Sequence, residues 1–102
     1  MIHVIATVEL NPGSRDAFLA EFHKVVPTVL EEAGCIAYTP TVDHLPAIPG
    51  QFEVGADRVV VVEQWESLDA LKAHGAAPHM KAYRAAVKPH VRGMELRVLT
   101  PA

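Results

Sequence analysis

The chain has 102 residues, and this length predicts one domain that spans residues 1–102. Half of the residues are apolar, 21% are charged and the net charge is −3, a balance typical of a globular protein that gives no electrostatic basis for binding nucleic acid or an anionic membrane. No apolar run approaches the ~20 residues of a membrane span, and the N-terminal residues lack the pattern of a signal peptide. Cys35 is the only cysteine, so an intramolecular disulfide is impossible and we expect a cytoplasmic protein.

The first third of the chain predicts a strand, a turn and a helix. Apolar and polar residues alternate over residues 2–10 with the two-residue period of a strand, and Asn11-Pro12-Gly13 predicts a turn. Residues 14–33 carry apolar side chains at intervals of three and four, which predicts a helix. Pro27 lies inside this helix and should kink or split it, and Gly34 fits the left-handed position that ends a helix.

The middle of the chain predicts an edge strand followed by a long loop. Residues 35–43 have strand character, and Pro40 favours an edge position or a bulge. Residues 44–57 contain two Pro and two Gly and form a loop that is long for a compact domain. Its apolar residues should not face water together, so we expect them to cover a pocket mouth or a second subunit: Leu45, Ile48, Phe52 and Val54.

The rest of the chain predicts a strand, two short helices and a final strand. Residues 58–65 include four consecutive valines, which predicts a strand that is apolar on both faces. Ser67 is a suitable N-cap for the first short helix. Pro78 suits the first turn of the second helix, which Pro89 ends, and residues 91–99 alternate like a strand.

Two strand–helix–strand units in a chain of this length predict an α+β fold, a ferredoxin-like βαββαβ arrangement with helices on one face of an antiparallel sheet. Helices cover only one face of such a sheet, whereas the valine-rich strand is apolar on both. We therefore expect a homodimer in which two sheets pack face to face as a dimeric α+β barrel, with a small apolar chamber between them. His3 and Thr7 are candidates for a polar part of its lining.

Several stretches carry a resemblance to a known family. Residues 61–74 read Val-Val-Glu-Gln-Trp-Glu-Ser-Leu-Asp-Ala-Leu-Lys-Ala-His and are followed by Pro78-His79-Met80. Ile2-His3-Val4-Ile5-Ala6, the Asn11-Pro12-Gly13 turn and residues 32–38 fit the same pattern. In these residues the chain resembles the antibiotic biosynthesis monooxygenase (ABM) family, especially its quinol monooxygenase-like members.

The resemblance implies an activity as well as a homodimeric α+β barrel. Characterised members oxidise phenolic or quinol-type aromatics with O2, without metal or organic cofactor, and other members are isomerases, haem degraders or proteins without known activity. Haem degradation is disfavoured, because those relatives have a Trp in the helix where this chain has Ala73-His74. We expect a cofactor-independent monooxygenase acting on a small aromatic substrate. A small-carbonyl isomerase or tautomerase of the same fold and a non-catalytic dimer that binds a small molecule are the alternatives.

Cofactor-free oxygenation needs a general base, because a phenol must lose its proton before its anion can donate an electron to O2. Histidine titrates near neutral pH, so His79 and His74 are the candidate catalytic residues. Trp65 could supply an aromatic wall for the substrate. Tyr83 and Glu63 could hydrogen-bond a substrate hydroxyl or orient a histidine.

These side chains also have structural interpretations. The two histidines could face solvent or helix-terminal carbonyls, and the two aromatic residues could be plain core. Glu63 is flanked by valines and needs either a partner or a position at the barrel mouth, and Arg97 and His3 are its candidate partners.

The spacing of the histidines gives no reason to expect a metal. A helical zinc pair places two His four residues apart with a Glu between them. His74 and His79 are five residues apart with Pro78 between them, so a continuous helix would not align them. The chain also has no cysteine cluster and no Gly-rich phosphate loop.

Overall fold

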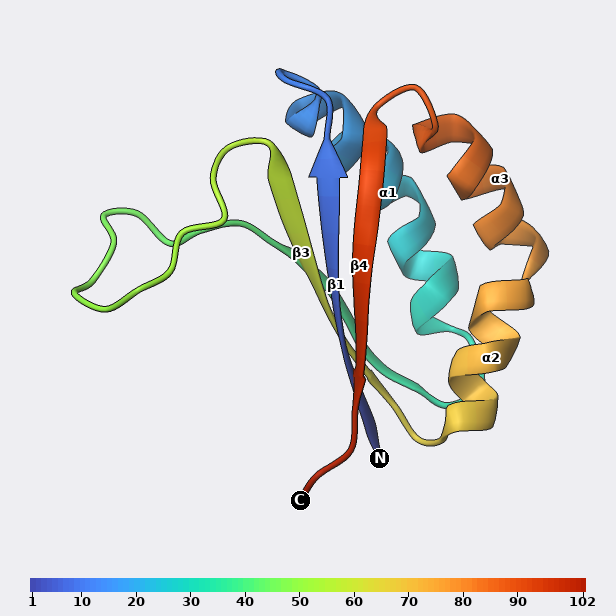
Figure 1. Ribbon diagram of the computed structural model, residues 1–102. Coiled ribbons are helices and arrows are strands. Elements are labelled where there is room, and N and C mark those ends of the chain that lie inside the picture. Colours follow the sequence, from blue (N-terminus) through green and yellow to red (C-terminus); the bar gives the residue numbers. More distant parts are fainter.

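The structure contains four strands and three helices in the predicted order. The computed structural model describes residues 1–102. Its elements are β1 (Ile2–Leu10), α1 (Arg15–Leu30), β2 (Cys35–Thr41), β3 (Arg58–Trp65), α2 (Leu68–Ala76), α3 (Pro78–Val87) and β4 (Val91–Leu99), as Figure 1 shows. None of the three helices has both the length and the apolar character that crossing a membrane would need.

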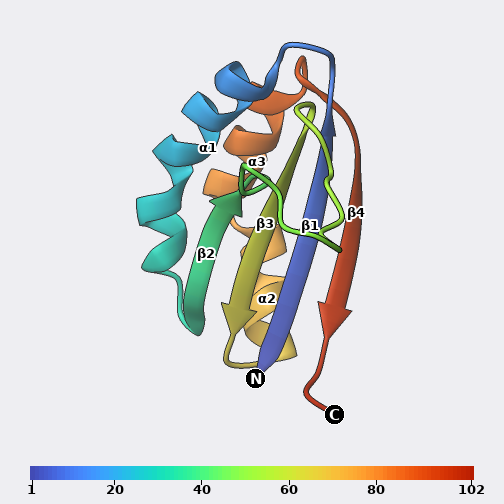
Figure 2. The same ribbon diagram turned by 90° about the vertical axis from the view of Figure 1, so that its left-hand side faces the viewer.

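The four strands form one antiparallel sheet with the order β2-β3-β1-β4. Val4 of β1, for example, pairs with Glu63 of β3 on one side and with Val98 of β4 on the other. All three helices lie on one face of this sheet, and the other face is free of helices (Figures 1 and 2). The predicted ferredoxin-like α+β fold is confirmed.

The core lies between the helices and the covered face of the sheet. Alternate residues of β1 and β3 point into it, and α1 adds a stripe at helical spacing: Val4, Ala6, Val8, Leu10, Val59, Val61 and Trp65, with Phe18, Phe22, Val25 and Val29. Phe22 also stacks on Tyr38 of β2, with ring centroids 5.2 Å apart. Burial of one such large side chain contributes about 1.5–3 kcal/mol, so this layer fixes the helices on the sheet.

Helix α1 differs from the sequence expectation at its C-terminal end. It is one helix that contains Pro27, so of the two expected effects, a kink or a split, the split is wrong, and the helix ends at Leu30 rather than at residue 33. Gly34 then takes the predicted left-handed conformation, with φ +83°. A Cβ atom on Gly34 would lie 2.6 Å from the Cβ of Ala70, so α2 packs here at a distance that only glycine permits.

The segment between β2 and β3 extends from the face of the sheet that the helices leave free (Figures 1 and 2). β2 ends at Thr41 rather than at residue 43, because the carboxylate of Asp43 accepts hydrogen bonds from the N–H groups of Val54 and Gly55 and closes the base of the loop. The side chains of Leu45, Ile48 and Phe52 are exposed, Phe52 to 86%.

Candidate active site

A largely apolar cavity of about 250 Å³ lies between the covered face of the sheet and helices α2 and α3. The strands β1, β3 and β4 contribute Ala6, Val8, Val61, Glu63, Met94 and Leu96 to its lining, and α2 and α3 contribute Leu71, His74, Gly75, Met80, Tyr83 and Arg84. Phe22 of α1 and Tyr38 of β2 complete it. Small-molecule sites usually combine apolar walls with a few polar groups and have volumes of about 300–1,000 Å³, so this cavity suits a small ligand.

The cavity is not where the sequence placed the binding chamber. We expected a chamber between two facing sheets, whereas this cavity lies within one chain on the helix-covered face. His3 and Thr7 do not line it, because they alternate with Val4, Ala6 and Val8 along β1 and so point to the opposite face.

Glu63 is the only carboxylate that lines the cavity, and its side chain is almost fully buried. Its Oε1 accepts a hydrogen bond from the indole Nε1–H of Trp65 at 2.9 Å. Burial raises the pKa of Glu63, while the hydrogen bond from the indole of Trp65 opposes this rise. The partners suggested from the sequence, Arg97 and His3, are wrong, because both belong to the opposite face of the sheet.

Aromatic side chains do line the cavity, but Trp65 is not among them. Trp65 is fully buried in the core next to Glu63, and the walls are formed by Phe22, Tyr38 and Tyr83. Burial, reinforced by the Glu63 carboxylate, raises the pKa of both tyrosines. Both phenols therefore keep their protons at neutral pH and can donate a hydrogen bond to a ligand oxygen.

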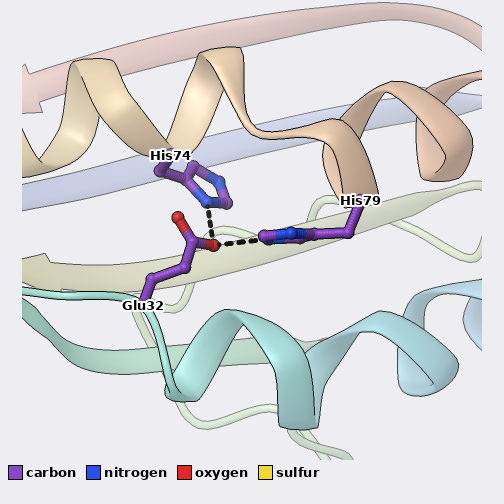
Figure 3. A group of neighbouring side chains, drawn as sticks. All are labelled: Glu32, His74 and His79. Carbon is purple, nitrogen blue, oxygen red and sulfur yellow. Dashed lines mark hydrogen bonds and ion pairs between the residues drawn. The ribbon is translucent and has the colours of Figure 1, made fainter.

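His74 lies near the C-terminal end of α2, with its ring packed against two aromatic side chains. Its ring centroid is 4.7 Å from that of Trp65 and 5.3 Å from that of Tyr38. Its Nδ1 lies 2.8 Å from Oε2 of Glu32 (Figure 3). An ionised carboxylate can only accept, so Nδ1 of the neutral ring carries the proton and Nε2 keeps its lone pair.

The Nε2 atom of His74 is open to the cavity. This nitrogen has no hydrogen-bond partner within the chain. Every fully buried side-chain nitrogen or oxygen of the chain does have a partner, so Nε2 is not fully buried. Nε2 is therefore reachable by a water-sized molecule, and the space that His74 lines is the cavity. The ring thus presents a proton acceptor to a bound ligand, with a carboxylate fixed behind it.

His79 approaches the same carboxylate oxygen from the first turn of α3. Its Nε2 lies 2.9 Å from Oε2 of Glu32, so the two histidines share one acceptor atom (Figure 3). His79 does not line the main cavity; it borders a separate surface hollow between α1 and α3. The structure therefore brings both predicted catalytic histidines together, but only His74 reaches the cavity.

Glu32 joins the two histidines and was not among the predicted site residues. It lies in the turn after α1, where its N–H donates to the carbonyl of Val29 and its carbonyl accepts from the N–H of Cys35. The histidines can both reach it because Ala77 is extended and Pro78 begins a new helix, so the spacing rule for one continuous helix does not apply. One sequence signal was present: an acidic residue next to a helix C-terminus opposes the helix dipole and needs a partner.

Comparison with known proteins identifies the family. The family model for antibiotic biosynthesis monooxygenase matches residues 1–86. An Escherichia coli K12 protein named "Probable quinol monooxygenase YgiN" is 47% identical over 103 residues, which cover 99% of this chain and 98% of that protein. Rv0793 of Mycobacterium tuberculosis has a TM-score of 0.80 at 26% identity, covering 99% of this chain and 94% of that one. PA3566 of Pseudomonas aeruginosa, at 22% identity, shares the fold with a TM-score of 0.81 and coverage of 99% and 93%. The chain therefore belongs to the antibiotic biosynthesis monooxygenase family.

Proposed function

We propose that this chain is a cofactor-independent monooxygenase that oxidises a small quinol-type aromatic with O2 in the cavity between the sheet and the helices. The observation that carries the proposal is the position of the His74 ring, whose Nδ1 lies 2.8 Å from the Glu32 carboxylate and which lines an apolar cavity. Membership of the family, and an Escherichia coli relative named as a quinol monooxygenase, support the substrate class.

The cavity lining fits a planar aromatic ring with hydroxyl groups. Phe22 and Tyr38 give the lining aromatic contact surface, and apolar side chains occupy most of the remainder. The phenols of Tyr38 and Tyr83 can donate to a substrate oxygen, while Nε2 of His74 accepts from a substrate hydroxyl. The lining thus offers both donors and an acceptor to a substrate that carries both.

The proposed reaction begins when Nε2 of His74 takes a proton from a quinol hydroxyl. The resulting imidazolium is stabilised by the carboxylate of Glu32 2.8 Å away. The apolar walls keep bulk water from the quinol anion, which then transfers an electron to O2. One oxygen atom enters the ring, the other leaves as water, and the quinol becomes a hydroxyquinone. All the electrons that reduce O2 come from the quinol, so this reaction needs no external reductant.

The geometry favours His74 over His79 as the base. Both were candidates from the sequence, but Nε2 of His79 points to Glu32 and its ring borders the outer hollow. His79 instead adds a second donor to the oxygen that orients His74. Its role is to position the carboxylate.

We further propose that residues 1–102 act as one ABM-like domain that pairs as a homodimer in the cytoplasm. β4 lies beyond the family match at residues 1–86 and completes the sheet by pairing with β1, which supports a single unit. Val62 on the free sheet face and Phe52 in the loop are exposed apolar groups that a second copy would cover. The unpaired Cys35 agrees with a reducing compartment.

Oxygen uptake by the untagged protein on a panel of hydroquinones tests the activity. We expect uptake with incorporation of one labelled oxygen atom from heavy-isotope O2 into the product, measured by mass spectrometry. His74→Ala should lower the rate by about 10²–10⁴-fold, the usual contribution of a general base. His23→Ala removes an exposed histidine from α1 and is the matched control.

The alternatives predict different results in the same experiment. Absence of uptake on the whole panel would contradict the monooxygenase. An absorbance change of a diketone under argon would then indicate an isomerase that uses the same His74. Inactivity in both assays, with a higher unfolding temperature on adding a quinol, would indicate a protein that only binds the ligand.

A further inference from the structure

The Glu32, His74 and His79 side chains form a donor set of the kind that binds a divalent transition metal. One oxygen and two imidazole nitrogens converge from three segments of the chain, and the three ligand atoms all lie within 4.8 Å of one another (Figure 3). Two histidines and one carboxylate suit Zn²⁺, Co²⁺ or Ni²⁺, whereas Mg²⁺ and Ca²⁺ prefer oxygen ligands only. The fourth position of a tetrahedral site would be left for water.

The surroundings of the three side chains hold them near ligating positions. The ring of His74 is fixed between Trp65 and Tyr38, and the backbone of Glu32 is hydrogen-bonded on both sides. Rigid supporting contacts of this kind determine the affinity of a metal site as much as the ligands themselves. The side chain of His79 is 26% exposed and borders the outer hollow, which gives an ion a route from solvent.

A metal and the present hydrogen bonds compete for the same atoms. The donor–acceptor distances of 2.8 and 2.9 Å are hydrogen-bond lengths. Ligand atoms about 2.0–2.1 Å from a tetrahedral zinc ion must lie farther apart than this. Each histidine nitrogen would have to move a few tenths of an ångström away from the Glu32 oxygen, and the partly exposed His79 can supply such a movement from the first turn of α3.

We propose that these three residues form a Zn²⁺-type site and that the ion, by occupying Nδ1 of His74, inhibits the enzyme. A neutral imidazole has one proton, so a metal on Nδ1 forces that proton onto Nε2. The nitrogen that faces the cavity then donates instead of accepting, and it can no longer take a proton from a phenol. The inhibition rests on the proposed monooxygenase function; the binding of the ion does not.

Isothermal titration of the untagged protein with Zn²⁺ tests the binding. We expect one ion per chain, and a visible absorption spectrum of a four-coordinate site when Co²⁺ is used instead. His79→Ala and Glu32→Gln should each weaken Zn²⁺ binding by at least about tenfold. His44→Ala, which removes an exposed loop histidine, should leave binding unchanged. Equal affinities for the wild type, His79→Ala and Glu32→Gln would overturn the site.

Two further measurements keep the proposal testable if a variant misfolds or the protein proves inactive. In the wild type, Zn²⁺ should shift the imidazole NMR signals of His74 and His79 and leave those of His23 and His44 in place; the reverse pattern would overturn the site.

In the oxygen-uptake assay, Zn²⁺ should inhibit the wild type reversibly, and His79→Ala should need at least about tenfold more Zn²⁺ for half-inhibition. Zn²⁺ binding without inhibition of an active enzyme would overturn the tautomer argument. Absence of all uptake would contradict the proposed function alone.

Discussion

Glu63 is an ionisable side chain inside an apolar layer, and its surroundings make the stability of the protein depend on pH. Burial raises the pKa of Glu63 in the folded chain above its ordinary value. At a pH between the ordinary pKa of the unfolded chain and the raised pKa of the folded chain, the folded state keeps a proton that the unfolded state has lost. The stabilisation from this proton is complete below the ordinary glutamate pKa and is lost as the pH rises through the folded pKa. At neutral pH, burial of the Glu63 carboxylate therefore lowers the stability of the folded chain.

Glu63→Gln should remove this part of the pH dependence. Its side chain keeps an oxygen that accepts from the indole N–H of Trp65, but it has no charge to bury. We expect a higher midpoint of thermal unfolding at pH 8, by about 4 °C or more if the gain reaches ~1 kcal/mol, and a difference that shrinks towards pH 4. Thermal unfolding followed by circular dichroism between pH 4 and pH 8 measures the midpoint and how the difference changes with pH. Glu53→Gln in the exposed loop is the control, and parallel melting curves for Glu63→Gln and the wild type would contradict the argument.

The packing of α2 against the turn after α1 positions Glu32 near both histidines, and Gly34 controls this packing. Gly34→Ala should destabilise the chain for two reasons: its φ is +83°, and its new Cβ would lie 2.6 Å from the Cβ of Ala70. A left-handed backbone costs a non-glycine residue about 1–2 kcal/mol, and overpacking adds about 1–3 kcal/mol. Urea unfolding followed by tryptophan fluorescence measures the sum.

Gly50 offers a matched control for Gly34. Its φ is +85°, nearly the same, but nothing lies within 4 Å of an added Cβ. Gly50→Ala should therefore show only the conformational cost, and the difference between the two variants isolates the contact with α2. Adding Ala70→Gly to Gly34→Ala should restore part of the lost stability. Equal destabilisation by both single variants would mean that the contact with Ala70 contributes nothing.

Local patterns were sufficient to predict the elements but not all of their junctions. Strand alternation and helical spacing act over a few residues, and they predicted all seven elements in order. The split at Pro27 did not occur: the proline lies in the last turn of α1, and the helix ends three residues later at Leu30. The break at Pro78 was predicted, but its consequence was not: it turns His79 towards the carboxylate that His74 also contacts.

Part of the candidate site follows from side-chain chemistry that can be read in the sequence, and the rest depends on tertiary packing. His74, Glu63 and Tyr83 were singled out for their chemistry, and all three line the cavity. Glu32 could not be paired with the histidines, because it is 42 and 47 positions away from them in sequence. The position of the cavity depends on how three helices lie on the sheet, which no local pattern specifies.

The whole molecule has one face of its sheet without a covering layer, and this face should join two copies of the chain. Val62 pairs with Ile5 and Thr39 across this face and is 37% exposed. The projecting loop lies on the same side of the sheet (Figure 2), and its Phe52 and Ile48 side chains are exposed. Light scattering at micromolar concentration should give twice the chain mass of 11.1 kDa. Val62→Lys should shift this mass towards one chain, because it buries an unpaired charge in the interface.

Leu30→Lys is the matched control for assembly, because it places the same charge on an exposed leucine of α1, on the opposite side of the sheet. It should leave the mass unchanged, and a single-chain mass for the wild type would contradict the dimer.

The dissociated Val62→Lys variant also tests where the chemistry takes place. Because the cavity and His74 belong to one chain, oxygen uptake per chain should survive dissociation. A chamber between two sheets, as the sequence first suggested, would lose its activity together with the dimer.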